Sequence, residues 1–528
     1  MLYASCAAFD GQLDATFNGG TVITFINNFS TISATAIQAD GKIVSAGYSG
    51  TSASAIDFTL ARYNTNGLLD STFGVNGIRT TFLGGTANQI HAIVIQPDGK
   101  IVVGGQGTVD NAFVLARYTA DGTPDSTFGT AGTVVTVLSA PAGIFGIALQ
   151  ADGKIVVVGQ PLSAPKMFIV ARYYENGAID NGLQGGSGFG INGVALIDLP
   201  GADDASSIAV QEDGKIVVGG SAGPIGMRTF AAARLDTKGA LDLSFGGVGS
   251  VTTAFPADAQ GANLIVQPDG KIILIGSTGQ LNMQDFALVR YHSDGTLDSG
   301  FGMGGVTTTA IGNNDQIFQV VLQPDGKLVV AGFSDVNGID NFALARYNTN
   351  GVLDVTFNPS GTMPGVVVTP FNGGLASEAF QVALQQDGSI VASGAIFNVP
   401  SSNFGFGLAR YLNNNPLVAT QITAPINNIL FSNDTFTISG IAQNPSNIGI
   451  FADGILIGRA VTSGTTNSWS AQTTVPLANG SHVITAVAEY KNGNVNLLST
   501  NSVTINIDSC RSSLSSAIAS KYCSGTVV

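Results

Sequence analysis

The chain has 528 residues, of which 44% are hydrophobic and only 11% are Asp, Glu, Lys or Arg. Its formal net charge of −14 argues against nucleic acids and anionic membrane surfaces as partners, because both are bound mainly through Lys and Arg. No run of eighteen apolar residues occurs, so no transmembrane segment is expected.

Residues 1–12 form a short lead-in. Cys6 follows Leu2-Tyr3-Ala4-Ser5, a faint likeness to the end of a lipoprotein signal, but a basic start and an apolar core are lacking. We interpret this as a trimmed, mature N-terminus of an exported protein rather than a cytosolic one. Whether Cys6 is lipidated, paired or free stays open.

A Gln-x-Asp-Gly element then recurs along most of the chain. Its Gln residues lie at positions 38, 96, 150, 211, 267, 323 and 385, so the repeats are spaced 54 to 62 residues apart. Each unit holds four short runs rich in Val, Ile, Phe and Tyr, bounded by Gly, Asn and Asp, a pattern typical of strands and turns. Asp98-Gly99 and its equivalents predict tight hairpins.

Four-stranded sheets that are apolar on both faces must stack on one another, and radial stacking gives a β-propeller. The fourth strands are expected near 77–82, 133–138, 193–197, 249–254, 305–310 and 365–369. The seventh unit ends after Phe406–Tyr411 without a fourth strand, whereas residues 21–25 at the start of the array match one. We therefore predict that this N-terminal strand completes the seventh blade and closes the ring.

The repeated elements Gln-x-Asp-Gly-Lys, Phe-x-Leu-Ala-Arg-Tyr and Leu-Asp-x-x-Phe-Gly resemble the delta-60 repeat family over roughly residues 11–412. The resemblance implies a propeller-like architecture in bacterial proteins that are often secreted or displayed on the surface. It implies no catalytic residues.

The repeat stops at residue 412, and 413–417 read as a linker because Asn and Pro interrupt strands. Residues 418–508 predict an immunoglobulin-like β-sandwich with strands at 418–424, 434–441, 447–453, 455–460, 468–475, 481–490 and 497–507. The stretch around Trp469 resembles bacterial Ig-like modules of surface proteins. Residues 509–528 form a Ser-rich tail, in which we expect a disulfide between Cys510 and Cys523 if the protein is exported.

An Arg and an Asp recur at equivalent positions of the seven units. In six of the units the Asp follows the Arg by eight residues. The pairs are Arg62–Asp70, Arg117–Asp125, Arg172–Asp180, Arg234–Asp242, Arg290–Asp298 and Arg346–Asp354, and ring closure would join Arg410 to Asp14. They could be seven ligand sites. We favour a structural ion pair in each blade, because an Arg on an apolar strand needs a carboxylate, which we expect to bind bidentately.

Acidic residues collect in the two loop classes that share one face of the predicted propeller. The candidate binding rim consists of Asp203, Asp204, Asp258, Asp315, Asp335 and Asp340, and only Lys166 and Arg228 oppose the acids there. Such a rim could bind Ca²⁺ or a basic partner. An equally strong interpretation is that the acids keep an apolar protein soluble.

Catalytic motifs are absent from the sequence. The three histidines, His91, His292 and His482, lie in separate parts of the chain and do not predict a zinc site. We therefore expect no cofactor and favour a non-enzymatic bacterial surface or secreted protein that uses a propeller face for binding or adhesion to a glycan or protein. Two alternatives stay open: a subunit of an extracellular assembly that pairs with copies of itself, and a propeller enzyme that cleaves polysaccharide with two carboxylates.

Overall fold

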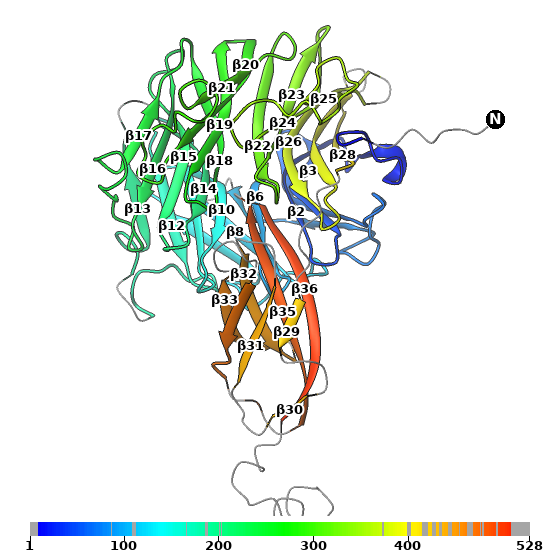
Figure 1. Ribbon diagram of the computed structural model, residues 1–528, viewed down its shortest axis with the longest axis vertical. Coiled ribbons are helices and arrows are strands. Elements are labelled where there is room, and N and C mark those ends of the chain that lie inside the picture. Colours follow the sequence, from blue (N-terminus) through cyan, green and yellow to red (C-terminus); the bar gives the residue numbers. More distant parts are fainter. Residues whose placement is uncertain are drawn as a thin grey trace, which may run out of the picture. The chain divides into compact units, whose positions relative to one another are not determined.

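A computed structural model describes most of the chain, and Figure 1 shows it coloured along the sequence. The described residues are 9–85, 87–107, 112–164, 166–184, 188–199, 201, 203–371, 374–398, 403–413, 421–424, 429–431, 436–441, 446–453, 455–461, 468–475, 477, 480–492 and 495–507. Cys6, Cys510 and Cys523 lie outside them. The chain divides into two compact units, of which the first holds residues 1–416 and the second most of the remainder.

The first unit consists of seven antiparallel four-stranded sheets. Sheets one to three comprise β2 Phe29–Ile37, β3 Ile43–Ser52, β4 Ala55–Tyr63, β5 Ile78–Thr81; β6 Gln89–Ile95, β7 Ile101–Gly107, β8 Ala112–Tyr118, β9 Thr133–Val137; β10 Ala142–Leu149, β11 Ile155–Pro161, β12 Phe168–Tyr173, β13 Val194–Ile197. Sheets four to six comprise β14 Asp204–Val210, β15 Ile216–Ala222, β16 Thr229–Leu235, β17 Ser250–Thr253; β18 Ala259–Val266, β19 Ile272–Gln280, β20 Met283–Tyr291, β21 Val306–Thr309; β22 Asp315–Leu322, β23 Leu328–Val336, β24 Ile339–Tyr347, β25 Val366–Thr369.

The seventh sheet combines the two ends of the array. It contains β26 Ala376–Leu384, β27 Ile390–Asn398, β28 Asn403–Tyr411 and the N-terminal β1 Thr21–Thr24, which follows the short helix η1 Asn18–Gly20. Thr21 is opposite Ala409 and Thr24 is opposite Phe406. The predicted closure by an N-terminal strand is confirmed.

The first strands of successive sheets pack side by side from β2 to β26, and β26 packs against β2 again. Apolar clusters join adjacent sheets; one of them holds Val102 and Phe113 of the second sheet with Ile144 and Val157 of the third. The result is an all-β, seven-bladed propeller in which the first strand of each blade is innermost. Its channel is therefore lined by seven strands that occupy equivalent positions in the repeat.

The blades are also linked by polar contacts between a Tyr and a Thr. The Tyr that ends the third strand of one blade is hydrogen-bonded to a Thr on the outer strand of the preceding blade, at 2.6–3.0 Å, in six of the seven blades. In the fourth blade Leu235 takes the place of Tyr and the preceding blade offers Ile197. The polar pair is thus replaced by an apolar pair at the same interface.

The second unit is a β-sandwich. One sheet contains β29 Gln421–Ala424, β31 Thr437–Ile441 and β34 Ser468–Gln472, and the strands β33 Ile455–Val461, β32 Ser446–Ala452, β35 Gly480–Asn492 and β36 Val495–Ile507 follow one another in the other. An eighth strand, β30 Ile429–Phe431, pairs in parallel with β36 and was not predicted. Trp469 is buried in the apolar core between the sheets, together with Ile450 and Ile484. Within the described residues, no helix has the length and apolar character needed to cross a bilayer.

Candidate functional site: the channel mouth of the propeller

The repeated Arg and Asp residues lie in contact in all seven blades. Each Arg Nε donates to one carboxylate oxygen of its Asp at 2.7–2.9 Å. In six blades the other carboxylate oxygen accepts the backbone N–H of the residue two positions further on. The bidentate geometry that we expected is therefore wrong: the Asp divides its two oxygens between the guanidinium and its own turn.

Each of these Arg side chains also contacts the neighbouring blade. In six blades the guanidinium donates to a backbone carbonyl of the turn after the next blade's third strand, as Arg62 does to Ala120. Arg346 instead contacts Asp10 and Asn413, which lie at the two ends of the array. The guanidinium also lies over a Phe ring at 4.6–4.9 Å in every blade. These contacts leave no room for a ligand between Arg and Asp.

The pKa of Asp125 agrees with a structural ion pair between each Arg and its Asp. Burial alone would raise the pKa of Asp125, but hydrogen bonds from Thr127 and the charges of Arg117 and Lys100 outweigh it and lower the pKa to about 2. Several of the Lys residues beside the hairpins approach the same carboxylates, as Lys42 does with Asp70 at 3.0 Å.

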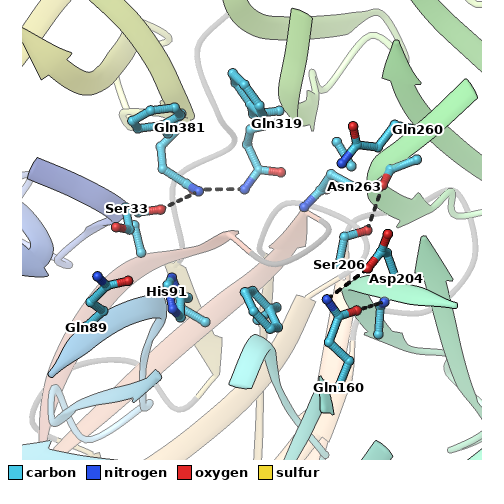
Figure 2. Close-up of a pocket in the computed structure, with 18 of the residues that line it drawn as sticks. Ser33, Gln89, His91, Gln160, Asp204, Ser206, Gln260, Asn263, Gln319 and Gln381 are labelled. Atoms are coloured by element: carbon cyan, nitrogen blue, oxygen red, sulfur yellow. Dashed lines mark hydrogen bonds between the residues drawn. The ribbon is translucent and has the colours of Figure 1, made fainter. Parts of the chain in front are cut away.

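A cavity of about 720 Å³ occupies the channel at the face that carries the hairpin loops between second and third strands. This volume is in the range of small-molecule sites. All seven innermost strands contribute to its wall, and Figure 2 shows ten of the lining residues labelled. The repeat thus forms the frame of the cavity, and the residues that differ between repeats form its lining.

Each innermost strand carries one β-bulge, and the extra residue of every bulge lines the cavity. These seven residues are Ser33, His91, Phe145, Ser206, Ala262, Phe318 and Phe380. Each stands five positions before the repeated Gln. Bulges re-aim side chains and are frequent beside functional sites. We name these seven residues the bulge ring. The sequence signal that could have identified it is a position at a fixed distance from the repeated Gln whose residue varies from unit to unit.

Aromatic side chains of the bulge ring form two pairs. His91 stacks on Phe145 with ring centroids 4.8 Å apart, and Phe318 meets Phe380 edge-to-face at 5.1 Å. Burial lowers the pKa of His91 to about 4, although a hydrogen bond with Gln106 opposes the shift. Its imidazole is therefore neutral at pH 7, and its Nε2 has no hydrogen-bond partner among the described residues.

Side-chain amides fill the spaces between these rings. Gln319 donates to Gln381 at 2.9 Å, and Gln381 in turn donates to the carbonyl of Ser33, so one side of the wall is joined across three blades (Figure 2). On another side, Asn263 is 5% exposed and its Oδ1 has no partner among the described residues. Gln260 beside it is exposed.

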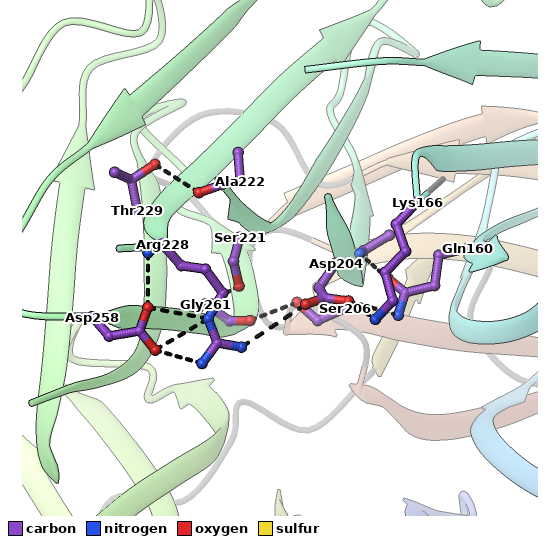
Figure 3. A network of polar contacts seen from close by, with 11 residues as sticks. Gln160, Lys166, Asp204, Ser206, Ser221, Ala222, Arg228, Thr229, Asp258 and Gly261 are labelled. Carbon is purple, nitrogen blue, oxygen red and sulfur yellow. Dashed lines mark hydrogen bonds and ion pairs between the residues drawn. The ribbon is translucent and has the colours of Figure 1, made fainter. Parts of the chain in front are cut away.

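The charged part of the wall lies where the third, fourth and fifth blades meet (Figure 3). Asp204 forms an ion pair with Lys166, accepts a hydrogen bond from Gln160 at 3.1 Å, and lies 3.9 Å from Arg228 Nη1. Arg228 is held by both carboxylate oxygens of Asp258. Two cations and two carboxylates therefore balance, and the wall presents fixed dipoles rather than a net charge.

The six carboxylates of the predicted rim do not gather at one point. Among them only Asp204 lines the cavity. Asp203 and Asp315 are fully buried, and each accepts backbone N–H groups of its own loop, from Leu199 and from Ile311 with Gly312 respectively. Asp335 and Asp340 face each other across the hairpin of the sixth blade, where Asp335 accepts the N–H of Gly338 at 2.7 Å.

Within the described part of the chain, no group of three His, Cys, Asp or Glu side chains is arranged to hold a metal ion. His292 lies beside Asp298 and His482 beside Asp453, and neither is among the residues that line the cavity. Of the three histidines, only His91 reaches the cavity.

Comparison with known families agrees with this architecture. The model described as "Domain of unknown function (DUF5122) beta-propeller" matches residues 38–73, 96–128, 150–182, 211–245, 267–301 and 323–357, and the "Bacterial Ig domain" model matches 419–486. The chain thus combines β-propeller repeats with a bacterial Ig domain. No curated protein matches it.

Several solved structures are similar to the chain at low identity. They include polysaccharide lyase Uly1 (12% identity, TM-score 0.40, covering 77% of this chain and 97% of that one) and a PL25 ulvan lyase bound to a saccharide (11%, 0.42, 75% and 96%). Sqt1 from Chaetomium thermophilum is a third (11%, 0.31, 94% and 98%). At such TM-scores these likenesses say nothing about the chemistry of the channel.

Proposed function

We propose that the protein is a non-enzymatic, secreted or surface-exposed bacterial protein that binds a glycan in the channel mouth of its propeller. The observation that carries the proposal is the cavity of about 720 Å³ with a lining of aromatic rings and side-chain amides. The matched bacterial Ig domain supports a bacterial origin. The seventh unit, which the propeller family model does not cover, we assign to the same repeat as the other six, of delta-60 type.

A glycan fits the chemistry of this wall. The C–H faces of a sugar ring pack on aromatic side chains such as Phe145 and Tyr48, and its hydroxyl groups both donate and accept hydrogen bonds, as amides do. The paired charges around Asp204 add polar contacts without selecting strongly for ions. A protein ligand would need a broad apolar surface, whereas this lining is concave and mixed.

The competing enzyme hypothesis required two carboxylates facing each other. Among the described residues of the lining, Asp204 is the sole carboxylate, and Lys166 neutralises it. A hydrolase that uses a general acid and a second carboxylate is not supported by such a wall. We therefore favour the hypothesis of glycan binding over that of polysaccharide cleavage.

A glycan array that carries bacterial, plant and algal polysaccharides tests the proposal, followed by calorimetry with each positive. We expect binding that Phe145→Ala weakens at least tenfold. Met303→Ala is the matched control, because Met303 is 90% exposed and lies outside the lining. No binding to any arrayed glycan, or equal losses in both variants, would contradict the proposal. Release of new reducing ends from a bound polysaccharide would instead identify an enzyme, and a concentration-dependent mass in solution would indicate an assembly subunit.

A further inference from the structure

The bulge ring is not uniform around the channel. Large rings occur in the second and third blades, as His91 and Phe145, and again in the sixth and seventh, as Phe318 and Phe380. The remaining positions are small: Ser33 in the first blade, and Ser206 and Ala262 in the fourth and fifth.

In a ring of seven blades the two aromatic pairs stand on opposite sides, and the small residues stand on opposite sides at right angles to them. In Figure 2, Ser33 lies across the cavity from Ser206 and Asn263, and His91 lies across from Gln319 and Gln381, which follow Phe318 and Phe380 in the chain. The space inside the bulge ring is therefore a slot with aromatic long sides and open, small-residue ends.

The ends of the slot are polar. At one end lie Ser33 and Thr31, and at the other lie Asp204, Gln260 and Asn263. Hydroxyl, carboxylate and amide groups form hydrogen bonds with the hydroxyl groups of a ligand. Apolar sides with hydrogen-bonding ends match a single sugar ring, which has two C–H faces and hydroxyl groups around its edge.

We propose that the slot takes one terminal sugar ring end-on, so that the protein recognises the end of a glycan chain rather than its interior. This rests on the proposed glycan binding and specifies its geometry. The two aromatic pairs enclose the faces of the ring. The rest of the glycan leaves through the channel mouth and makes few contacts, so affinity should depend little on chain length.

The repeats themselves supply the sharpest variants. Phe is the native residue at this position in three other blades, so a bulged strand of this fold accommodates it. Ser33→Phe should fill one end of the slot and Ala262→Phe the other. In Ser33→Phe the bond from Gln381 stays in place, because it goes to the backbone carbonyl of residue 33. Met303→Ala, which is exposed and outside the lining, again serves as the control.

The probes are methyl glycosides of glucose, galactose, mannose, rhamnose and xylose, together with linear oligosaccharides of two to six residues that end in each sugar. Saturation-transfer NMR and calorimetry measure their binding. We expect at least one methyl glycoside to bind, with affinity rising less than about fivefold from the disaccharide to the hexasaccharide. We expect Ser33→Phe and Ala262→Phe to lose this binding at least tenfold, and Met303→Ala to keep it.

Circular dichroism melting checks that both Phe variants are folded, and either folded variant suffices for the comparison. Affinity that climbs steadily with chain length, or binding by a folded Phe variant that equals wild type, would overturn end-on recognition while glycan binding stands. Failure of the wild-type protein to bind any arrayed glycan would overturn the proposed function, and end-on recognition with it.

Discussion

Removing the carboxylate of Asp125 should destabilise the propeller strongly. Asp125 is 6% exposed, and it holds the Nε of Arg117, which is itself 3% exposed, at 2.8 Å. Its other oxygen accepts two hydrogen bonds from Thr127, at 2.7 and 3.0 Å. In Asp125→Ala the guanidinium stays buried without its carboxylate, because its other partners are neutral carbonyl, amide and hydroxyl oxygens.

Breaking a buried ion pair from one side costs roughly 3–5 kcal/mol, since an uncompensated charge remains. Asp98→Ala in the same blade is the matched control. Asp98 contacts Lys100 at 3.1 Å in a more exposed turn, where such pairs contribute about 1 kcal/mol or less. The difference between the two variants, roughly 2–4 kcal/mol, isolates the effect of burial.

Equilibrium unfolding in urea, followed by far-UV circular dichroism, measures both variants. Tryptophan fluorescence would report on the wrong unit, because the single Trp of the chain, Trp469, lies in the sandwich. Equal unfolding midpoints for Asp125→Ala and wild type would refute the structural role that we assign to the pair.

Acid gives a second test of the same reasoning. The folded-state pKa of Asp125 is about 2, below its ordinary value of 3.8, so the carboxylate stabilises the native state above pH 3.8. This contribution is lost as the pH falls through 2. The stability gap between wild type and Asp125→Asn should therefore be constant from pH 5 to 7 and shrink between pH 4 and 2. A gap that is independent of pH would show that the charge contributes nothing.

Three further predictions concern other contacts. Deleting residues 9–24 leaves β28 with an unpaired edge, and we expect a lower melting temperature with aggregation in light scattering; an unchanged melt would mean that the ring does not depend on this closure. Tyr291→Phe should cost about 1 kcal/mol through the lost bond with Thr253, and a double-mutant cycle with Thr253→Val should show coupling rather than additivity. Burial, and then the charge of Asp340, raise the pKa of Glu378 to about 7, so wild-type stability should fall as the pH rises from 4.5 through 7. Glu378→Gln should be more stable than wild type at pH 8 and equally stable at pH 4. Melting temperatures of both proteins at the two pH values test this, and an equal difference at pH 4 and pH 8 would contradict it.

The architecture could be predicted because the same sequence pattern recurs along most of the chain. Strand boundaries such as Ile78–Thr81 and Val306–Thr309 fall inside the predicted ranges, since short apolar runs between Gly and Asn turns leave few alternatives. Closure followed from a missing fourth strand at one end and a spare strand at the other. The partner strand β30 in the sandwich, only three residues long, carried no such signal.

The site was harder to predict than the fold, for a physical reason. Sequence reasoning gives weight to charge, and it therefore selected the six loop acids, three of which bind the backbone of their own loop, as Asp315 does. The cavity is instead lined by residues displaced by β-bulges, and a bulge shows only in strand pairing. Phe145 and Ala262 read as ordinary core residues until the bulge moves them into the channel.

Closure of the seventh blade also sets an order on folding. Residues 21–24 pair with residues 406–409, so nearly four hundred residues separate the two halves of one sheet. During synthesis β1 stays unpaired while six blades form. Its partner β28 has a free edge until the two strands pair. Contacts of such long range slow folding and lengthen the time in which chains can join wrongly. A circular permutant would have residue 411 joined to residue 9 by a short linker and new termini between two other blades. In this chain β28 and β1 would be close in sequence, so it should fold to the same propeller faster.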